Sequence, residues 1–557
     1  MTVPRQSIAG FIHSLAVLLA LAWSFPLGAQ EAPTQDVAQV LERGARLEQE
    51  RQWADALTIY EEALRLHPER DDLHQRLVLV RSHYDVCRRY SDQTYTAALD
   101  TISERDATAI YDEVLQKIST HYVHEPNWQE LFRRGTVNLE VALAEPAFID
   151  RHFSRLGGPQ RDQQVAAAKK LLREYTAAVI VGDKAKASIY LEQMARSFKQ
   201  RFNLPVQATI LEYACGAAGS LDDYSGFLTG SQMDEVFAQI EGNFVGLGVE
   251  LKTEPSGLLI VNVIAGGPAA EKGIRPGERL IAVDGKTTKE MSPDALADLL
   301  RGEEGTAVRI EVLSNAKEKR ELSVTRRRVE VPSVDEIRIV DKEYGVGYFK
   351  IASFQKTTPR DVEAALWKLH EQGMRSLIVD LRGNPGGLLK AAVDVADKFV
   401  MDGMIVATRG RSKKEDFDHK GQIAGTWRVP LVVLIDHDSA SASEIFAGAI
   451  RDHRRGTVVG EKSYGKGSVQ GIFPLATSNV GVRLTTAKWY TPSGHAISGQ
   501  GVAPDIVVRT AARPVVADGD KVAEDAAAGK NNAASQPDDP ILRSGLQVAR
   551  SNLSRRP

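Results

Sequence analysis

The sequence predicts a multidomain protein in which an all-α N-terminal region and an inserted β-rich domain precede an α/β core. Three patterns in the 557-residue chain support this division. Apolar residues recur at helical spacing through most of residues 36–232, short β-branched runs separated by glycine turns fill residues 236–328, and strand and helix patterns alternate from 344 to 508. Such alternation is typical of a largely parallel sheet covered by helices.

The composition is ordinary for a globular protein and excludes a strongly charged binding surface. Hydrophobic residues make up 43% of the chain, charged residues 26%, and the formal net charge is −3. Because nucleic-acid-binding proteins carry a basic field, we expect no nucleic-acid partner. The 12 histidines show no metal-ligand spacing, so we expect neither a metal nor another cofactor.

The first 29 residues have the pattern of an export signal. Arg5 precedes an uninterrupted apolar run from Leu15 to Trp23, and small residues follow up to Ala29, where we expect cleavage. The alternative is an uncleaved membrane anchor. The run is shorter than the about 20 residues that a membrane-spanning helix needs, which favours the signal.

The chain contains only two cysteines, Cys87 and Cys215. Two cysteines in a large exported chain do not make a disulfide framework. We expect two buried thiols, with a bridge between them as the alternative.

Residues 36–90 are expected to form helices that include a tetratricopeptide-like pair. Apolar residues recur at helical spacing from Leu47 to Leu66, and Pro68 ends the run. The run that begins at Trp53 resembles one tetratricopeptide unit, and an unrelated helical hairpin is an equally good interpretation. Because such units are normally stable only when stacked, this copy must dock on something.

Residues 100–232 are predicted to be mainly helical and to lead into the α/β core. Alanine- and leucine-rich runs at 164–181 and 185–199 carry this prediction. The region holds no motif of its own until the segment Leu221-Asp222-Asp223-Tyr224-Ser225.

Residues 236–328 are predicted to form a β-rich domain. The predicted order is a glycine loop, an apolar strand at 258–263, a helix near 293–301 and a last strand at 307–313. This order resembles a PDZ domain. The resemblance implies that backbone N–H groups of the glycine loop bind the terminal carboxylate of a peptide; this loop is Gly246, Leu247, Gly248 and Val249. A free sheet edge would accept the peptide as one more strand.

Residues 334–510 are predicted to form the α/β core. The runs at 376–380 and 431–435 are continuously apolar, as in strands buried on both faces of a parallel sheet. Each is followed by a loop and a helix pattern. Residues 511–557 are predicted to be a disordered tail, because residues 517–540 in particular have too little apolar surface to pack.

Three loops in this core carry groups that suit catalysis. The first is a serine cluster, where a strand leads into a helix whose N-terminus would stabilise an oxyanion. Spacing does not distinguish Ser439, Ser441 and Ser443, and each taken alone is better explained as a helix cap. The second loop holds Lys466 between two glycines and, taken alone, fits a solvated lysine. The third, at 380–389, taken alone fits a tight glycine turn.

Together these loops resemble the carboxyl-terminal processing proteases, the S41 serine peptidases with a Ser–Lys dyad. The resemblance runs from about Asp222 to Val508, with the PDZ domain inserted before the catalytic core. It implies a crotonase-like α/β protease core. The segments 485–494 and 501–506 match further motifs in the same order.

Carried over residue by residue, the resemblance assigns roles to six positions. The nucleophile falls on Ser441, the base on Lys466, and Gln470 matches the glutamine that orients the lysine. The donors to the oxyanion are expected to be the backbone N–H groups of Ala442 and of Gly386 or Gly387, with Gly386 preferred.

The mechanism that follows depends on the pKa of the lysine. An ordinary lysine, with a pKa of about 10.4, is protonated at neutral pH and accepts no proton. Burial lowers the pKa, so that a neutral Lys466 could take the Ser441 proton and an acyl-enzyme could form. One departure from the family pattern is the run 436–438, Asp-His-Asp in place of Asn-x-Gly. Asp436 and Asp438 are expected to raise the pKa of Lys466, and the missing glycine to strain the turn if it needs a positive φ.

The resemblance implies an exported serine endopeptidase, periplasmic in a bacterium and soluble or loosely membrane-associated, that selects proteins by an apolar C-terminal tail. The alternative is a catalytically weak or inactive scaffold in which the PDZ and tetratricopeptide-like segments bind peptides. The Ser441–Lys466–Gln470 set argues against the scaffold. A crotonase-like acyl-CoA enzyme would explain neither the PDZ domain nor the dyad. The sequence leaves open whether an adaptor protein docks on residues 36–90 and whether the protein forms a homo-oligomer.

Overall fold

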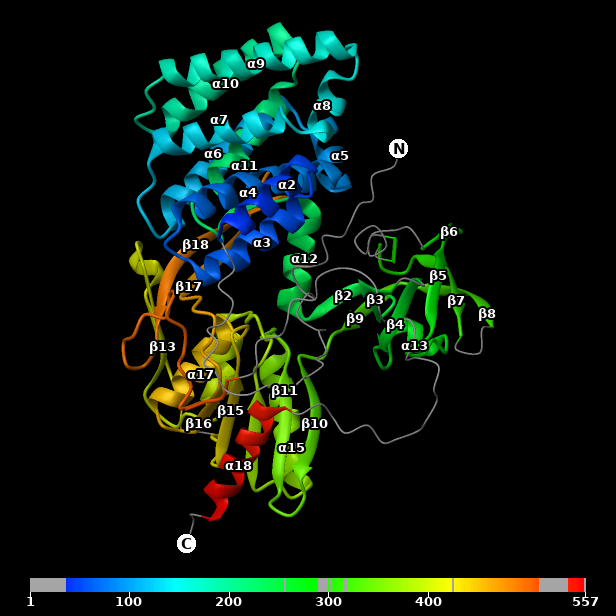
Figure 1. Ribbon diagram of the computed structural model, residues 1–557, viewed down its shortest axis with the longest axis vertical. Coiled ribbons are helices and arrows are strands. Elements are labelled where there is room, and N and C mark those ends of the chain that lie inside the picture. Colours follow the sequence, from blue (N-terminus) through cyan, green and yellow to red (C-terminus); the bar gives the residue numbers. More distant parts are fainter. Residues whose placement is uncertain are drawn as a thin grey trace.

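The computed structural model describes residues 37–254, 257–288, 299–300, 302–314, 318–422, 425–509 and 539–554 (Figure 1). The predicted export signal lies outside these ranges. Within them, no helix combines the length and the apolarity needed to cross a membrane. Cys87 and Cys215 are free thiols, as predicted; Cys215 is buried and Cys87 half-buried.

The N-terminal region is entirely helical up to residue 219 and forms the upper part of the molecule in Figure 1. Polar caps start several of its helices; Asp92, Ser103, Asn127 and Asp183 each accept a hydrogen bond from a first-turn N–H group. The helices are α2 (Val37–Gln49), α3 (Trp53–Leu66), α4 (Asp71–Ser91), α5 (Gln93–Thr101), α6 (Glu104–His121), α7 (Trp128–Ala142), α8 (Pro146–Phe153), α9 (Gly158–Ala178), α10 (Lys184–Phe202) and α11 (Val206–Gly219).

The tetratricopeptide-like pair is the hairpin of α3 and α4, and it docks within the chain. Together with α2 the hairpin has a small core of its own, in which the Tyr60 ring packs against Gly44. The far half of α4 enters the larger core of the helical region through Val86 and Tyr90. Arg51 on the α2–α3 turn also pairs with the buried Glu145 at 2.9 Å. One long helix therefore joins both cores.

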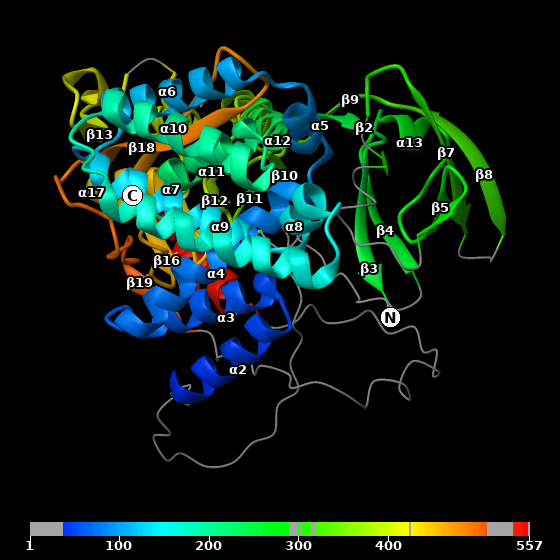
Figure 2. The ribbon, with the colours of Figure 1, turned by 90° about the horizontal axis from the view of Figure 1, so that it is seen from above.

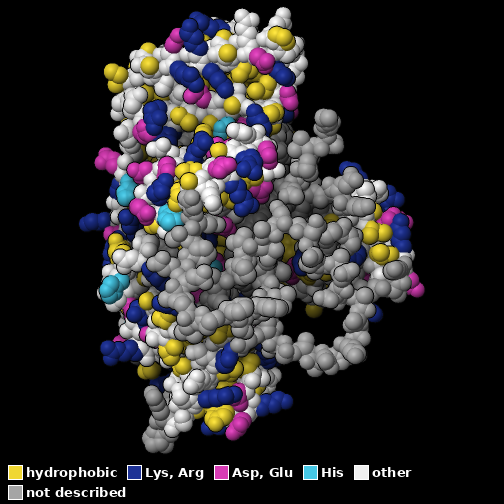
Figure 3. All heavy atoms as spheres, in the orientation of Figure 1, with side chains coloured by type: hydrophobic (Ala, Val, Ile, Leu, Met, Phe, Trp, Pro, Cys, Tyr) yellow, Lys and Arg dark blue, Asp and Glu magenta, His cyan; other side chains and the backbone are white. Residues whose placement is uncertain are grey.

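Charged side chains of both signs are interspersed over the helical region on the face shown in Figure 3. This agrees with the nearly balanced net charge of −3.

The β-rich domain lies to one side of the molecule and has its own core (Figures 1 and 2). Its sheet has the strand order β3-β4-β5-β7-β8, with β6 paired to β5. A separate two-stranded ribbon of β2 and β9 and helix α12 (Gly230–Glu241) lead to the core. The bounds are β2 (Asn243–Gly246), β3 (Val249–Glu254), β4 (Gly257–Val263), α13 (Pro268–Glu271), β5 (Arg279–Val283), β6 (Lys286–Thr287), β7 (Ala307–Leu313), β8 (Lys319–Thr325) and β9 (Arg327–Glu330).

The expected strands at 258–263 and 307–313 are present as β4 and β7. The helix expected near 293–301 lies almost wholly outside the described residues. Among the described strands β3 forms one edge of the sheet, because it pairs only with β4, and β8 forms the other. An edge strand can accept one further strand.

The predicted α/β core is present as a six-stranded sheet of order β10-β11-β12-β15-β16-β19. All neighbours pair in parallel except β10 and β11. The runs predicted at 376–380 and 431–435 form β12 (Ser376–Asp380) and β15 (Leu431–Ile435), and each is buried along its whole length. The other strands are β10 (Val334–Asp341), β11 (Val346–Ile351), β16 (Thr457–Gly460) and β19 (Ile506–Val507).

Alternate side chains of these strands face two different layers. Leu377 and Val379 pack with helices α15 (Thr358–Glu371), α16 (Leu389–Asp397) and α17 (Ala442–Asp452). The intervening Ile378 packs with Ile541 and Ala549 on the other face. A strand buried on both faces needs two covers, and the second one comes from the end of the chain.

The prediction of a disordered tail is therefore wrong for residues 540–554. These residues form helix α18 (Pro540–Ser554), drawn in red in Figure 1, which packs on β12, β15 and β16. The apolar residues of this segment recur at helical spacing, whereas those of the preceding stretch are few. The low apolar content of residues 517–540 does not apply to the residues that follow them.

A second, antiparallel sheet was not predicted. Its order is β1-β18-β13-β14, with β17 also paired to β18. The bounds are β1 (Gly226–Leu228), β13 (Met404–Gly410), β14 (Phe417–Lys420), β17 (Ser468–Pro474) and β18 (Gly481–Tyr490). Residues 475, 480, 482 and 484 of this sheet and its β17–β18 turn belong to the large core of the helical region. The second sheet thus joins the helices to the α/β core.

Candidate active site

The three loops singled out in the sequence lie at the carboxyl ends of three adjacent parallel strands. The glycine loop follows β12, the serine loop follows β15, and the lysine loop follows β16. Because β15 is paired to both other strands, the serine loop lies between the other two. Ligands of parallel sheets bind at this edge.

Ser441 differs from the two serines beside it. Ser439 and Ser443 are fully buried, and their hydroxyl groups donate to the backbone oxygens of Leu381 and Asn384 at 2.9 and 3.0 Å. Ser441 is the N-cap residue of α17, forms a capping box with Glu444, is only half-buried and has a φ of +54°. A non-glycine residue with positive φ is strained and is held by its surroundings, as at a nucleophile elbow. The structure therefore separates three serines that spacing could not.

Asp436 anchors the serine loop. Its carboxylate accepts hydrogen bonds from the N–H groups of Asp438 and Ser439, at 3.1 and 3.0 Å, and from the N–H group of Gly383 in the glycine loop at 3.0 Å. The positive φ of this loop falls on Ser441 and not on residues 436–438, so the turn needs no glycine there. The strain anticipated from the Asp-His-Asp run is absent from the described loop.

The glycine loop lies against Ser441. A side chain at Gly386 would come within 2.8 Å of the Ser441 Cβ and within 3.0 Å of the Ala442 nitrogen, and Gly386 has a φ of +108°. The Gly386 N–H group donates to Asn384 Oδ1 at 2.8 Å. As a donor to an oxyanion it would have to exchange this bond, whereas the Ala442 N–H group lies in the first turn of α17, where helical partners are lacking. Gly387 has a φ of +137° and packs closely against the Phe354 backbone.

Lys466 is half-buried and lies two residues before the start of β17. Burial is the main cause that lowers the pKa of Lys466 to about 8, and the positive charge of Arg483 lowers it further. Asp222 and Glu444 oppose this shift. Asp436 and Asp438, which the sequence suggested as the opposing acids, are not among the groups that act on it. The Lys466 Nζ lies 4.4 Å from the centre of the Tyr224 ring.

Glu444 connects the serine and lysine loops, and the sequence interpretation missed it. Its fully buried carboxylate accepts from the N–H groups of Ser441 and Lys466, at 2.7 and 2.9 Å, through one oxygen. The other oxygen accepts from the Gly465 N–H group and the Ser463 hydroxyl, both at 2.6 Å. A signal was available, because a serine followed three residues later by glutamate is the pattern of a capping box. Glu444 thereby holds the backbones of Ser441 and Lys466 next to each other.

Gln470 lies on β17, and its predicted role in orienting the lysine stays a prediction. Its side-chain amide donates to the hydroxyl groups of Ser468 and Thr485, at 2.8 and 3.4 Å. The pairing of β17 with β18 shifts register between Val469 and Gln470, which places Gln470 opposite Thr485. The amide is therefore directed across the strand pair.

The predicted carboxylate-binding loop forms the link between β2 and β3. The carbonyl oxygens of Leu247 and Gly248 accept from the N–H groups of Ala269 and Ile264, at 2.8 and 2.9 Å. Gly248 has a φ of +77°. Gly246 ends β2 and Val249 starts β3, so the loop lies at the beginning of the edge strand.

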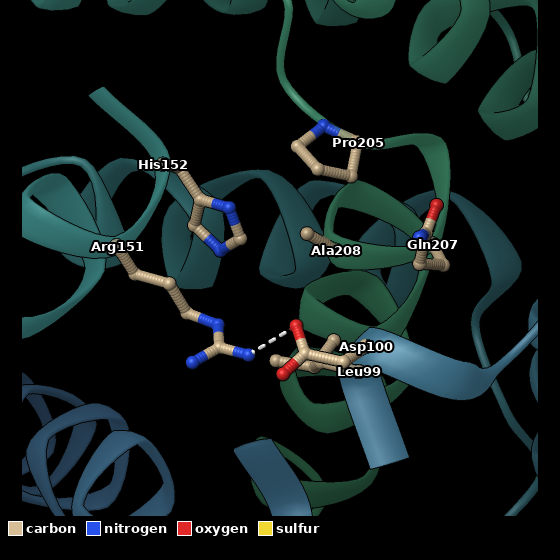
Figure 4. A pocket seen from close by; sticks show the side chains of 7 residues that line it. All are labelled: Leu99, Asp100, Arg151, His152, Pro205, Gln207 and Ala208. Carbon is tan, nitrogen blue, oxygen red and sulfur yellow. Dashed lines mark hydrogen bonds and ion pairs between the residues drawn. The ribbon is translucent and has the colours of Figure 1, made fainter. Parts of the chain in front are cut away.

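A cavity of about 390 Å³ lies elsewhere, among the N-terminal helices (Figure 4). Its lining includes Arg151, which pairs with Asp100 at 2.6 Å, and His152, whose burial lowers its pKa to about 4. None of the residues predicted for catalysis lines it. Among the described residues, no group of three or more His, Cys, Asp or Glu side chains is arranged to hold a metal.

Comparison with known proteins is consistent with this geometry. Residues 345–508 match the Peptidase family S41 and residues 259–314 match the PDZ domain. A carboxy-terminal-processing protease of Bartonella bacilliformis is 37% identical over 318 residues, which are 56% of this chain and 72% of that protein. A carboxyl-terminal-processing protease of Synechocystis is 40% identical over 47% of this chain and 62% of that protein. The solved structure of a photosystem II D1 C-terminal processing protease aligns over 72% of this chain and 93% of that chain, with 24% identity and a TM-score of 0.37.

The order of the three loops, the inserted PDZ domain and the identity to these relatives lead to one conclusion. The chain belongs to the carboxyl-terminal-processing proteases, serine-type peptidases of family S41.

Proposed function

We propose that the protein is an exported endopeptidase that holds the C-terminal tail of a protein substrate on its PDZ domain and cleaves with Ser441 as nucleophile and Lys466 as general base. The observation that carries this proposal is the Glu444 carboxylate, which binds the backbone N–H groups of both residues through one oxygen. A half-buried lysine with a lowered pKa, whose backbone lies beside that of a strained serine, suits proton transfer between them.

In the first step, neutral Lys466 accepts the proton of the Ser441 hydroxyl while the serine oxygen attacks the scissile carbonyl carbon. The negative charge that develops on the carbonyl oxygen is stabilised by the Ala442 N–H group and the positive end of α17. The C–N bond then breaks, and the leaving amine takes the proton back from Lys466. Water releases the acyl group by the same sequence of proton transfers, with Lys466 again as base.

The lowered pKa decides how much enzyme is ready to react. With a pKa of about 8, roughly a tenth of Lys466 is neutral at pH 7. With an ordinary lysine pKa of about 10.4, the neutral fraction would be roughly one in 2,500.

The PDZ domain suits the selection of protein tails. Its edge strand β3 offers backbone groups to an extended peptide, and the loop 246–249 stands at the start of that strand. Apolar C-terminal residues are the expected ligand. Export to the periplasm rests on the pattern of residues 1–29. An adaptor that docks on the α3–α4 hairpin and a homo-oligomer would both be compatible with this assignment.

The test compares cleavage of an unfolded protein with apolar C-terminal residues by the parent enzyme, Ser441→Ala and Lys466→Ala. Fragments are identified by mass spectrometry. Lys462→Ala, which removes an exposed lysine from the same loop, is the matched control and should cleave like the parent. Both active-site variants should lose cleavage by several orders of magnitude and still bind a C-terminal peptide.

Equal cleavage by the parent and the two active-site variants would refute the dyad. Peptide binding without cleavage by the parent, even with an activating protein present, would favour the scaffold alternative.

A further inference from the structure

The segment Leu221–Ser225 forms a rigid turn that has no part in the mechanism described above. The Asp222 carboxylate accepts from the N–H groups of Tyr224 and Ser225, both at 2.8 Å, and from the Ser225 hydroxyl at 3.1 Å. The Tyr122 hydroxyl donates to the Leu221 carbonyl at 2.8 Å. The turn is thereby closed on itself and tied to the end of α6.

The turn is also tied to β18, the strand next to the lysine loop. Arg483 Nε donates to the Tyr224 carbonyl at 2.7 Å, and the Thr485 N–H group donates to the Ser225 hydroxyl at 3.1 Å. From outside, Arg81 of α4 pairs with Asp223 at 2.7 Å. The backbone of the turn around Tyr224 is therefore held by contacts with β18 and with α4.

The side chain of Tyr224 is directed at the proposed base. The Lys466 Nζ lies 4.4 Å from the centre of the Tyr224 ring, close enough to exclude water from that side of the amine. An aromatic face also attracts the ammonium group that Lys466 becomes when it takes the serine proton. The ring therefore acts on the two properties that a general base needs here, which are its direction and its hydration.

We propose that Tyr224 is a positioning residue for Lys466, whose ring forms a wall of the lysine site, keeps water from the Nζ and fixes its direction. This inference rests on the proposed function, because it assumes that Lys466 is the base. It gives the Leu221–Ser225 turn, which the sequence singled out without a role, a place in the active site.

Other charges also act on Lys466 and have to be kept constant in a test. Arg483 of β18 favours the neutral amine, while Asp222 of the turn and Glu444 of α17 favour the charged one. Arg483 itself faces Asp85, Arg88 and Arg81 of α4. Substitutions at Tyr224 leave all of these groups in place.

Tyr224 itself stays neutral over the working range of pH. Its burial and the neighbouring Tyr464 hydroxyl raise the pKa of Tyr224 above its ordinary value. A pH shift in a Tyr224 variant would therefore report on the ring and not on titration of the phenol.

The expected sign follows from two opposing effects. Removal of the ring admits water, which favours the ammonium and raises the pKa of Lys466; loss of the aromatic face acts in the opposite direction. Hydration stabilises an ammonium more than an aromatic face does, so the pKa should rise.

The experiment measures kcat and KM from pH 6 to 10 for the parent, Tyr224→Ala and Tyr224→Phe, with the full-length mature enzyme and a short peptide substrate. Tyr224→Ala should lower kcat at pH 7 by about tenfold, move the acid limb of the profile up by about one pH unit, and leave KM within about twofold. Tyr224→Phe, which keeps the ring, should match the parent. Tyr122→Phe, which removes a hydrogen bond of the turn and leaves the Tyr224 ring, is the control for disturbance of the turn.

The proposal would be overturned if the acid limb of the kcat profile of Tyr224→Ala lay at the same pH as that of the parent. If circular dichroism shows that this variant does not fold, Tyr224→Leu decides in its place, with a shift in the same direction and of smaller size. Retained activity in Lys466→Ala would instead refute the base itself. An inactive Lys466→Ala together with an unshifted Tyr224→Ala would refute only the role of Tyr224.

Discussion

The PDZ domain and the helical region are attached to the protease core in different ways. Among the described residues, the PDZ domain has a hydrophobic cluster of its own, which extends from Leu247 to Val324 and includes no residue of the protease core. The helical region shares its main cluster with Val482 and Leu484 of β18. Because apolar burial is the main stabilising contribution, the helices and the second sheet should behave as one body, and the PDZ domain as another.

This difference separates two ways of influencing the dyad. The PDZ domain reaches the core through the β2–β9 ribbon and α12, so a bound tail would act by moving a separate body. The helical region is part of the framework of the site, since β18 pairs with β17 two residues after Lys466. The first is suited to selection of substrates, and the second to keeping the lysine in place.

The largest expected effect comes from the shared cluster. Leu484→Ala removes a fully buried side chain between the helices and β18 and should lower the free energy of unfolding by about 3–5 kcal/mol. Denaturant unfolding followed by circular dichroism and by peptidase activity should show helices and activity lost in one transition. Helices that survive after activity has gone would show that the two regions are not one body.

The matched change in the PDZ core should be nearly as large and confined to that domain. Ile310→Ala should destabilise the PDZ domain by about 2–4 kcal/mol, because Ile310 is 2% exposed in its separate cluster. Hydrogen exchange should increase in strands β3 to β8 of the PDZ sheet and not elsewhere in the described chain. Cleavage of a short peptide that does not use the PDZ groove should be unchanged, and a loss there would show tighter coupling than the structure implies.

The pH dependence of the reaction should be a property of the core alone. With the pKa of Lys466 at about 8, kcat/KM should rise with pH and gain about tenfold between pH 7 and pH 9, since the neutral lysine is the reactive form. Ile310→Ala should show the same limb. If the pH at which kcat/KM rises differed between Ile310→Ala and the parent, the PDZ domain would influence the pKa of Lys466.

The smallest effect is expected at the junction of the ribbon with the core. Arg360 pairs with Glu330 of β9, and its side chain is 66% exposed. Since exposed ion pairs contribute little, Arg360→Ala should change the free energy of unfolding by less than about 0.5 kcal/mol. The informative measurement is the ratio of PDZ-dependent to PDZ-independent cleavage, which should change only if this contact restrains the domain.

The sequence was sufficient for the α/β core because its strands are signalled locally. A continuous apolar run such as Leu431–Ile435 has one reasonable explanation, which is a strand covered on both faces. The origin of the second cover was not predictable from composition, and α18 was missed for that reason. The antiparallel sheet was missed because its longer strands do not alternate between buried and exposed residues: β18 is buried along most of its length, and β17 is half-buried up to its last residue.

The active site shows the same division between local and spatial information. The positions of Ser441 and Lys466 follow from the family motifs. The pattern Ser441-x-x-Glu444 predicts a capping box at the start of a helix. The same carboxylate also binds the lysine loop, because β15 lies beside β16 in the sheet. The spacing of residues in the sequence does not predict this pairing of strands. The Tyr224 ring reaches Lys466 across more than 200 residues of sequence in the same way.

Helix α18 also bears on how the protein behaves in solution. Residues 540–554 cover one face of the parallel sheet and are held there by ion pairs of Arg382 with Asp539 at 2.8 Å and of Arg550 with Asp341 at 2.6 Å. If this segment left the sheet, the apolar face of β12 and β15 would be uncovered. An enzyme shortened at residue 509 for easier handling would therefore expose that face and tend to aggregate.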